Sequence, residues 1–260
     1  MPESAPVKSS VPTTPGLAQD VVGEKTLELF EKNAAYSEFI WETLVGLSPD
    51  AVSGRVLEVG CGIGNLTRIV LRRPDVTLLH SIDLDPAYVA RVRGTVDDVR
   101  LHLTAVSAEE FCPPEYSGAA NGFDCIFSSN VLEHIEDDVR VLRNFRAMLK
   151  PRGVVLVLVP AHEFLFSGLD RSLSHFRRYT RKSLSERART AGLEPVRIRY
   201  FNPIGAAGWW LNGKVLGRQT LPAGQLSFYS RFGISLSRWV DRYNPLPLGV
   251  SVLAALERTD

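Results

Sequence analysis

The chain has 260 residues, of which 45% are apolar and 23% are charged, so it can form one substantial α/β domain with an elaboration, or at most two small domains. Its 30 Lys and Arg residues balance 29 acidic ones, and the net charge of +1 argues against a general nucleic-acid binder. The three cysteines lack the spacing of a disulfide framework or a zinc site, which favours a reducing, cytoplasmic location.

Residues 1–17 are rich in Pro, Ser and Thr and lack the apolar stretch of a signal peptide. They cannot bury enough apolar surface to offset chain entropy, so we expect a disordered leader at 1–17 and a folded domain at 18–260. No apolar run approaches the roughly 20 residues that cross a bilayer, so no integral membrane segment is expected.

A helical apolar period runs from about Lys25 to Leu47, and short apolar runs then alternate with helical stretches. This alternation predicts a mostly parallel sheet with helices on both faces. The predicted strands are Arg55–Val59, Val76–Ile82, Val99–Leu103, Phe123–Ser128 and Val154–Val159. The predicted helices between them are Leu66–Arg73, Ala87–Arg93 and Asp137–Leu149.

The alternation of predicted strands and helices becomes irregular in the last third of the chain. A helix is predicted at Arg181–Ala191, with Gly192 as its stop, and a strand at Pro195–Phe201. Residues 202–248 combine glycines and prolines with many aromatic residues, and Gly249–Leu256 again has the pattern of a strand. Because an insertion of this length exceeds a plain connector, 202–248 is predicted to form a cap or a binding wall. Its Trp and Phe residues equally fit a small satellite core or a subunit interface.

The strongest motif is VLEVGCGIGNLT at residues 56–67, where a buried strand runs into a glycine-rich turn. Gly60, Gly62 and Gly64 permit the tight turn and remove Cβ atoms that would keep a ligand from the backbone. Their Gly-x-Gly-x-Gly spacing departs from the dinucleotide fingerprint. Glu58, inside the strand, is positioned to meet a cationic ligand group.

Two further segments point to a nucleoside. Asp83 ends the next strand within SIDLDP, where its carboxylate can accept hydrogen bonds from both ribose hydroxyls. Asp85, just before a proline, is predicted to cap the following helix. Ala108 and Glu109 follow the third strand, where an adenine ring could stack; taken alone, Glu109 reads equally as a helix N-terminal acid.

Together these segments resemble class I S-adenosylmethionine-dependent methyltransferases, in particular the small-molecule group that includes the ubiquinone and menaquinone methyltransferases. VLEVGCGIGN is similar to the family's first motif and SIDLDP to its acidic second-strand motif. FDCIFSSNVLEHIEDD is similar to the fourth-strand motif and KPRGVVLVLVP to the fifth. The resemblance covers roughly residues 25–200 and implies a Rossmann-like, seven-stranded, mostly parallel sheet whose last strand is antiparallel.

The resemblance also implies S-adenosylmethionine as the cofactor. It places Glu58 and Gly60 near the methionine part, Asp83 at the ribose, and Ala108 with Glu109 on the adenine side. Tyr36 would close over the cofactor, with core packing as the other interpretation. The implied cofactor residues are Tyr36, Glu58, Gly60, Gly62, Gly64, Asp83, Leu84, Ala108, Glu109, Asn130 and Val131.

A sulfonium is an activated methyl donor, so the enzyme must align the reactants, exclude water and accept a proton; no metal site is predicted. The candidate bases are His134, His162 and His175. His134 fits at least as well as a helix N-terminal residue with a structural hydrogen bond. The segment around His175 resembles an Asp…Gly-His-x-Arg-Arg-Tyr pattern of one subgroup, with Ser174 where glycine is common. Here His175 is predicted as the acceptor-side base or hydrogen-bond donor. The predicted substrate-orienting residues are Asp170, Arg178 and Tyr179; a salt-bridged structural loop remains the alternative.

Methylation of oxygen is favoured over nitrogen or carbon, because a neutral hydroxyl benefits from a histidine base. The acceptor is expected to be a small molecule, aromatic, sugar or lipid-linked, and a homo-oligomer is left open. Alternatives are a non-catalytic S-adenosylmethionine-binding partner subunit and, less favoured by the glycine spacing, a nicotinamide-dependent oxidoreductase. A nucleic-acid methyltransferase is disfavoured because Ser129–Leu132 replaces that class's Asn/Asp-Pro-Pro-Tyr/Phe motif.

Overall fold

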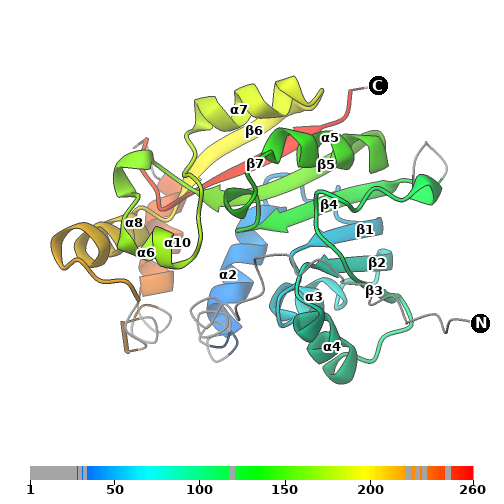
Figure 1. Cartoon of the computed structure of the whole chain (residues 1–260), viewed down its shortest axis with the longest axis horizontal. Coiled ribbons are helices and arrows are strands. Elements are labelled where there is room, and N and C mark those ends of the chain that lie inside the picture. The colour runs from blue at the N-terminus through cyan, green and yellow to red at the C-terminus, as the bar shows by residue number, and fades with distance from the viewer. Residues whose placement is uncertain are drawn as a thin grey trace, which may run out of the picture.

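The computed structural model describes residues 28, 31, 34–116, 121–220, 224, 225, 229, 233–243 and 247–259. The predicted leader and most of the first part of the first predicted helix lie outside these residues. Within the described part, one sheet runs through the molecule and helices cover both of its faces (Figure 1). This arrangement confirms the α/β prediction.

The sheet has seven strands in the order β3-β2-β1-β4-β5-β7-β6. All pairings among the first five strands are parallel, whereas β7 is antiparallel to both β5 and β6. The strands are β1 Gly54–Val59, β2 Val76–Asp83, β3 Leu101–Ala105, β4 Phe123–Ser129, β5 Leu149–Pro160, β6 Glu194–Phe201 and β7 Ser251–Glu257. The predicted seven-stranded sheet with an antiparallel last strand is therefore confirmed.

Two large apolar clusters fill most of the space between the sheet and its helices, and a third, small one contains Cys61, Val89 and Val92. Of the two large clusters, one lies under α5 and α7, and the other under α2 and α3 (Figure 1). The central strands contribute to both clusters because successive residues point to opposite faces, as Val56 and Leu57 do. The helices are α2 Ala34–Val45, α3 Asn65–Val70, α4 Pro86–Thr95, α5 Asp138–Met148, α6 Gly168–Ser172 and α7 Arg181–Thr190.

Local signals set several helix ends as predicted. The Asp85 side chain accepts a hydrogen bond of 2.7 Å from the N–H of Ala87, and Pro86 is the first residue of α4. Gly192, just after α7, has a φ of 79°, the left-handed conformation that ends many helices. Helix α3 is shorter than the helical pattern near Leu66–Arg73, because it ends at Val70 and the chain turns there.

Strand β5 begins earlier than the apolar run predicted. Leu149 already pairs with Phe123 of β4, and the register shifts before Cys125 pairs with Val154. The intervening Arg152 has a φ of 62°, which absorbs the irregularity. The residues before Val154 are polar and typical of a turn, so the apolar pattern did not predict them as part of the strand.

Between β6 and β7, the described residues of the insertion are largely helical. They form α8 Pro203–Trp210, a π-helical turn η4 Leu211–Val215 and α10 Ile234–Tyr243. Shorter 3₁₀ turns lie elsewhere, at η1 Pro114–Tyr116, η2 Leu132–His134 and η3 Glu163–Leu165. None of the described helices is long and apolar enough to cross a membrane. A cap function for 202–248 stays a prediction.

Candidate active site

The glycine-rich loop leaves β1 and enters α3 at the carboxyl edge of the sheet. Gly60, Gly62 and Gly64 all have positive φ, at 80°, 50° and 84°. A Cβ atom on Gly60 would lie 2.3 Å from Cγ2 of Val131, in the turn after β4. The loop therefore passes so close to this turn that its first glycine cannot carry a side chain.

Asp83 ties the loop to the end of β2. Its carboxylate accepts hydrogen bonds from the N–H groups of Gly62, at 2.7 Å, and Asp85, at 3.0 Å. Burial raises the pKa of this half-buried carboxyl, and the backbone hydrogen bonds counteract that rise. Each oxygen keeps a further lone pair, so Asp83 can also accept hydrogen bonds from two ribose hydroxyls.

Glu58 lies beneath the loop. Its side chain is buried, and Oε2 accepts hydrogen bonds from the hydroxyls of Thr67, at 2.7 Å, and Ser81, at 2.6 Å. Burial raises the pKa of Glu58 to about 7, although these hydrogen bonds counteract the rise. The carboxyl group thus supports α3 and β2 from inside the protein, and its contact with a ligand stays a prediction.

The end of β2 also offers an apolar surface. Leu84 is 69% exposed, immediately after Asp83. The N–H of Val106 donates to the carbonyl of Asp83 at 2.8 Å, which holds the turn containing Ala108 and Glu109 beside the end of β2. An exposed leucine next to a carboxylate suits the base and the ribose of a nucleoside, so the residues present fit the cofactor that the sequence implies.

Two other predicted cofactor residues border this edge. Asn130 follows β4 with a φ of 54°, and its N–H donates to the carbonyl of Leu158 at 2.8 Å. Tyr36, on α2, packs edge-to-face on the ring of Tyr229 with centroids 6.1 Å apart. Burial raises the pKa of the Tyr36 hydroxyl. The packing agrees with the core interpretation of Tyr36, whereas closure over the cofactor stays a prediction.

Two of the three predicted histidines meet near the turn after β4. The rings of His134 and His175 lie edge-to-face with centroids 4.8 Å apart. His175 places Nδ1 3.1 Å from Oδ1 of Asp170 and Nε2 3.9 Å from Oε1 of Glu133. The His175 side chain is 7% exposed and His134 is exposed at the surface, so the pair reaches from the interior to solvent.

Asp170 is the centre of a buried polar network. It accepts hydrogen bonds from Nε of Arg178, at 2.7 Å, from Nε1 of Trp209, at 3.2 Å, and from the N–H of Ser167, at 2.9 Å. Burial alone raises the pKa of Asp170, but the hydrogen bonds from His175 and Arg178 outweigh it and lower the pKa to about 2.

Arg178 and Tyr179 are both buried. Arg178 also donates to the carbonyl of Ala161 at 2.9 Å, and its guanidinium lies 4.8 Å from the centre of the Trp209 ring. The Tyr179 hydroxyl lies 2.6 Å from Oδ2 of Asp138. These contacts match the salt-bridged structural loop that the sequence left open, and direct contact with a substrate stays a prediction for both residues.

His162 lies apart from the histidine pair, at the end of β5. Its φ is 61°, its ring stacks on Tyr200 of β6 at 4.3 Å, and Nε2 is buried without a hydrogen-bond partner among the described residues. Burial lowers its pKa, and the charges of Arg178 and Arg181 lower it further. His162 thus packs on the outer strand β6, whereas His134 and His175 gather beside β4.

Sequence reasoning missed Glu133 and Trp209. Glu133 is fully buried, both carboxylate oxygens lack a hydrogen-bond partner in the described part of the chain, and burial raises its pKa to about 8. Its place between the apolar residues Leu132 and Ile135 was the available signal. Trp209 belongs to the insertion, where no sequence pattern connects it with Asp170.

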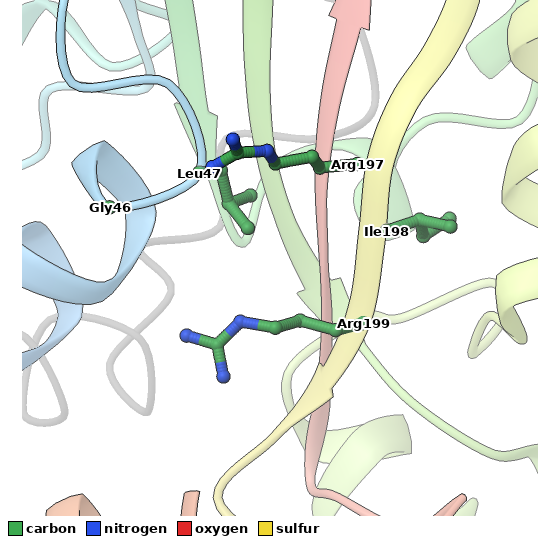
Figure 2. A pocket seen from close by; sticks show the side chains of 5 residues that line it. All are labelled: Gly46, Leu47, Arg197, Ile198 and Arg199. Carbon is green, nitrogen blue, oxygen red and sulfur yellow. The ribbon is translucent and has the colours of Figure 1, made fainter. Parts of the chain in front are cut away.

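The described residues also line two open hollows on the α2 side of the sheet. One, of 380 Å³, is lined by Gly46, Leu47, Arg197, Ile198 and Arg199. In Figure 2, Arg197 and Arg199 reach from β6 toward the end of α2, whereas Ile198 points away. The other, of 460 Å³, shares Arg199. Neither contains a predicted cofactor residue, and β6 is separated from β1 by β4, β5 and β7.

Comparison with known proteins agrees with this geometry. A family described as a methyltransferase domain matches residues 29–198. The chain is 32% identical over 168 residues to the ubiquinone biosynthesis O-methyltransferase of Bordetella avium, covering 58% of this chain and 67% of that protein. It is 24% identical over 176 residues to the ubiquinone biosynthesis O-methyltransferase of Haemophilus ducreyi, covering 62% of this chain and 74% of that protein. A match to that of Histophilus somni, 30% identical, covers 39% and 42%.

Solved structures share the fold at lower identity. An S-adenosylmethionine-dependent methyltransferase from Mesorhizobium loti has a TM-score of 0.58 at 17% identity, covering 85% of this chain and 98% of that one. The N-methyltransferase NodS from Bradyrhizobium japonicum, in complex with S-adenosyl-L-homocysteine, has a TM-score of 0.53 at 17% identity, covering 85% and 88%. The fold, the glycine-rich loop and the family match lead to one conclusion: the chain belongs to the class I S-adenosylmethionine-dependent methyltransferases.

Proposed function

We propose that this methyltransferase transfers the methyl group of S-adenosylmethionine to a hydroxyl oxygen of a small molecule, with histidine-assisted removal of the hydroxyl proton. The carrying observation is the contact between His175 and Asp170, next to His134 and beside the turn after β4. Relatives named as ubiquinone biosynthesis O-methyltransferases support oxygen as the acceptor atom. When bound, the cofactor supplies a methyl group on a positively charged sulfur.

On the cofactor side, the chain has to bind and orient a nucleoside. Asp83 accepts the ribose hydroxyls, and Leu84 with Ala108 flanks the base. The loop from Gly60 to Gly64 lets the ligand approach the backbone closely. Asn130 follows β4 at the same edge of the sheet.

On the acceptor side, the chain has to position a hydroxyl and take up its proton. The Asp170 carboxylate accepts the Nδ1–H of His175, which fixes the ring and leaves the Nε2 lone pair available to the hydroxyl. Arg178 and Trp209 hold Asp170 in place through their own hydrogen bonds. Phe176, which follows His175, and Trp210, which follows Trp209, are exposed aromatic side chains. They support a flat or lipid-linked acceptor, and a sugar is a second class to test.

Calorimetric titration with S-adenosylhomocysteine, run beside NAD and NADP, tests the cofactor half of the proposal. We expect binding of S-adenosylhomocysteine alone, weakened about tenfold, or about 1.4 kcal/mol, in Asp83→Ala because the ribose loses its acceptor. A folded protein that does not bind S-adenosylhomocysteine contradicts the proposal, and a response to NAD would favour an oxidoreductase.

Methyl transfer to a panel of phenols, sugars and amines tests the acceptor half. His175→Gln is expected to lower kcat by roughly 100-fold or more without changing the affinity for S-adenosylhomocysteine, since it loses only the proton acceptor. His102→Gln, an exposed histidine of β3, is the matched control and should keep full activity. Turnover of amines alone would contradict O-methylation, and full affinity with no turnover of any acceptor would favour a non-catalytic partner subunit.

A further inference from the structure

We propose that Glu133, His134 and His175 form a binding site for one divalent transition-metal cation, such as Zn²⁺, on the acceptor side of the methyl-transfer site. Each residue offers one ligand atom, and these atoms all lie within 4.8 Å of one another. One carboxylate oxygen and two imidazole nitrogens are a donor set that suits zinc and its neighbours in the first transition row. The location next to the acceptor rests on the proposed function, but cation binding itself does not.

The burial of Glu133 is the first reason to expect a cation. Its side chain is 0% exposed, and neither carboxylate oxygen has a hydrogen-bond partner in the part of the chain that the structure describes. Native proteins rarely leave a buried carboxylate in this state, because its desolvation is not compensated. A cation held between Glu133 and the two histidines would provide the missing interaction.

The orientation of His175 is the second reason. Asp170 lies 3.1 Å from Nδ1, so this nitrogen donates its hydrogen and Nε2 is left as the ligand atom facing Glu133. Carboxylate–histidine–metal chains of this kind fix the ring and the tautomer of metal-binding histidines. The 3.9 Å between Nε2 and Oε1 of Glu133 exceeds the separation of about 3.4 Å between two ligands of a tetrahedral zinc ion, so this pair needs to close by about half an ångström. The ligand atoms as a set lie up to 4.8 Å apart, so the most distant pair needs to close by up to about 1.4 Å.

The nearby arginines are paired with other carboxylates, so their charges do not exclude a cation at Glu133. Arg178 is the guanidinium that acts on Glu133, but it is already neutralised by Asp170 at 2.7 Å and also donates to the carbonyl of Ala161. Arg177 pairs with Asp138 at 3.1 Å. Neither arginine is therefore paired with Glu133, and its carboxyl group stays available to bind a cation.

The backbone holds the ligands together although they come from distant parts of the sequence. The N–H of Phe176 donates to the carbonyl of Glu133 at 2.8 Å, which ties the residue after His175 to the turn after β4. Three protein ligands leave a position for water or for an oxygen of the acceptor. In the cation-bound state the histidines would act as ligands in place of the base role proposed above, and the charge of the cation would favour release of the acceptor hydroxyl's proton to solvent water.

The test is a titration of the full chain with Co²⁺, after treatment with a chelator and its removal. We expect one equivalent to bind with the visible absorption spectrum of a four- or five-coordinate cobalt site, and Zn²⁺ to displace it. Glu133→Gln and His175→Ala should weaken binding at least 10-fold, and Asp170→Asn should weaken it 10- to 100-fold by freeing the His175 ring. His102→Ala is the matched control and should bind as the unaltered protein does.

The outcomes separate this inference from the proposed function. S-adenosylhomocysteine is titrated into the same metal-free protein, and circular dichroism checks that each variant is folded. Binding of S-adenosylhomocysteine without one-to-one binding of Co²⁺ overturns the cation site and leaves methyl transfer in place. Cobalt binding that persists unchanged in Glu133→Gln and His175→Ala also overturns it, because the metal then sits on other histidines.

Discussion

At the scale of single residues, Gly60 is the position of the glycine-rich loop that tolerates substitution least. Its φ of 80° and the 2.3 Å that would separate an added Cβ atom from Val131 act together against any side chain. Gly60→Ala is therefore expected to lower the free energy of unfolding by about 2 to 4 kcal/mol and to weaken S-adenosylhomocysteine binding. Urea unfolding and calorimetry measure the two effects.

The matched control for this change is Gly94→Ala. Gly94 lies within α4, and a Cβ atom there would meet nothing within 4 Å. Alanine has the higher helix propensity, so this variant should gain up to about 1 kcal/mol in stability. Equal stability of the two variants would show that neither the backbone conformation nor the contact with Val131 constrains the loop.

Glu58 gives the loop a pH-dependent stability. Its pKa of about 7 lies above the 4.5 of an unburied glutamate, and Asp83 adds to the rise. The folded protein keeps the proton between these pH values while the unfolded chain has released it, so this group makes the protein less stable as pH rises through the window. The free energy of unfolding of Glu58→Gln, compared with that of the unaltered protein, should therefore rise by about 2 to 3 kcal/mol between pH 5 and pH 8.

Urea unfolding at the two pH values measures that gain. The exposed Glu186→Gln is the control, because it changes a glutamate without changing a buried contact. A stability difference between Glu58→Gln and the unaltered protein that stays constant with pH would mean that Glu58 remains ionised in the folded state.

Single residues also differ in how far the sequence reveals them. The tight turn at Gly60 could be predicted, because it depends on the backbone at one strand end. The contact of Asp83 with a ribose stays a prediction. Glu133 could not be predicted, because its unusual state depends on complete burial and on His175, which reaches it only through the tertiary fold. For the same reason the sequence predicted no metal-binding group.

At the scale of elements, Asp138 joins α5 to α7. It pairs with Arg187 of α7 at 2.6 Å and accepts the hydroxyl of Tyr179 just before α7. Tyr179→Phe should lower the free energy of unfolding by about 1.5 to 3 kcal/mol, because a buried charged acceptor loses one donor. If the role is structural, the KM for the acceptor stays unchanged.

Tyr200→Phe is the control for that experiment. Among the described residues, the Tyr200 hydroxyl forms one long hydrogen bond, which it accepts from the N–H of Arg181 at 3.5 Å. Its removal should lower the free energy of unfolding by less than about 0.5 kcal/mol. A large rise in KM for Tyr179→Phe with unchanged stability would instead support the substrate contact predicted from the sequence.

Elements with a strong apolar period were predictable, and those shaped by neighbours were not. The core of β5 follows from its run of buried valines and leucines, but its start depends on Leu149 pairing with β4. The helices α8 and α10 arise in a segment rich in glycine and proline. Their local propensity is weak, and packing against the rest of the molecule decides their conformation.

At the scale of the whole molecule, the proposed cofactor site joins the ends of several strands, so ligand binding should stabilise the entire domain. At 100 times its Kd, S-adenosylhomocysteine is expected to add about 2.7 kcal/mol to the free energy of unfolding, which corresponds to a rise in Tm of about 5 to 10 °C. Thermal unfolding with and without the ligand measures this rise. Asp83→Ala at the same ligand concentration should show a smaller rise, and an equal one would argue against Asp83 as a ligand contact.

The position of β7 has a consequence for how the protein is made. Although β7 follows β6 in the chain, it lies between β5 and β6 and pairs with both. During synthesis, β1 to β5 can assemble as they leave the ribosome, but β6 has no strand to join until residues 251–257 emerge. Until then β5 presents an open edge to other nascent chains. Stalled or truncated products that end before residue 251 should therefore aggregate, and chaperones that shield this edge should matter most in that interval.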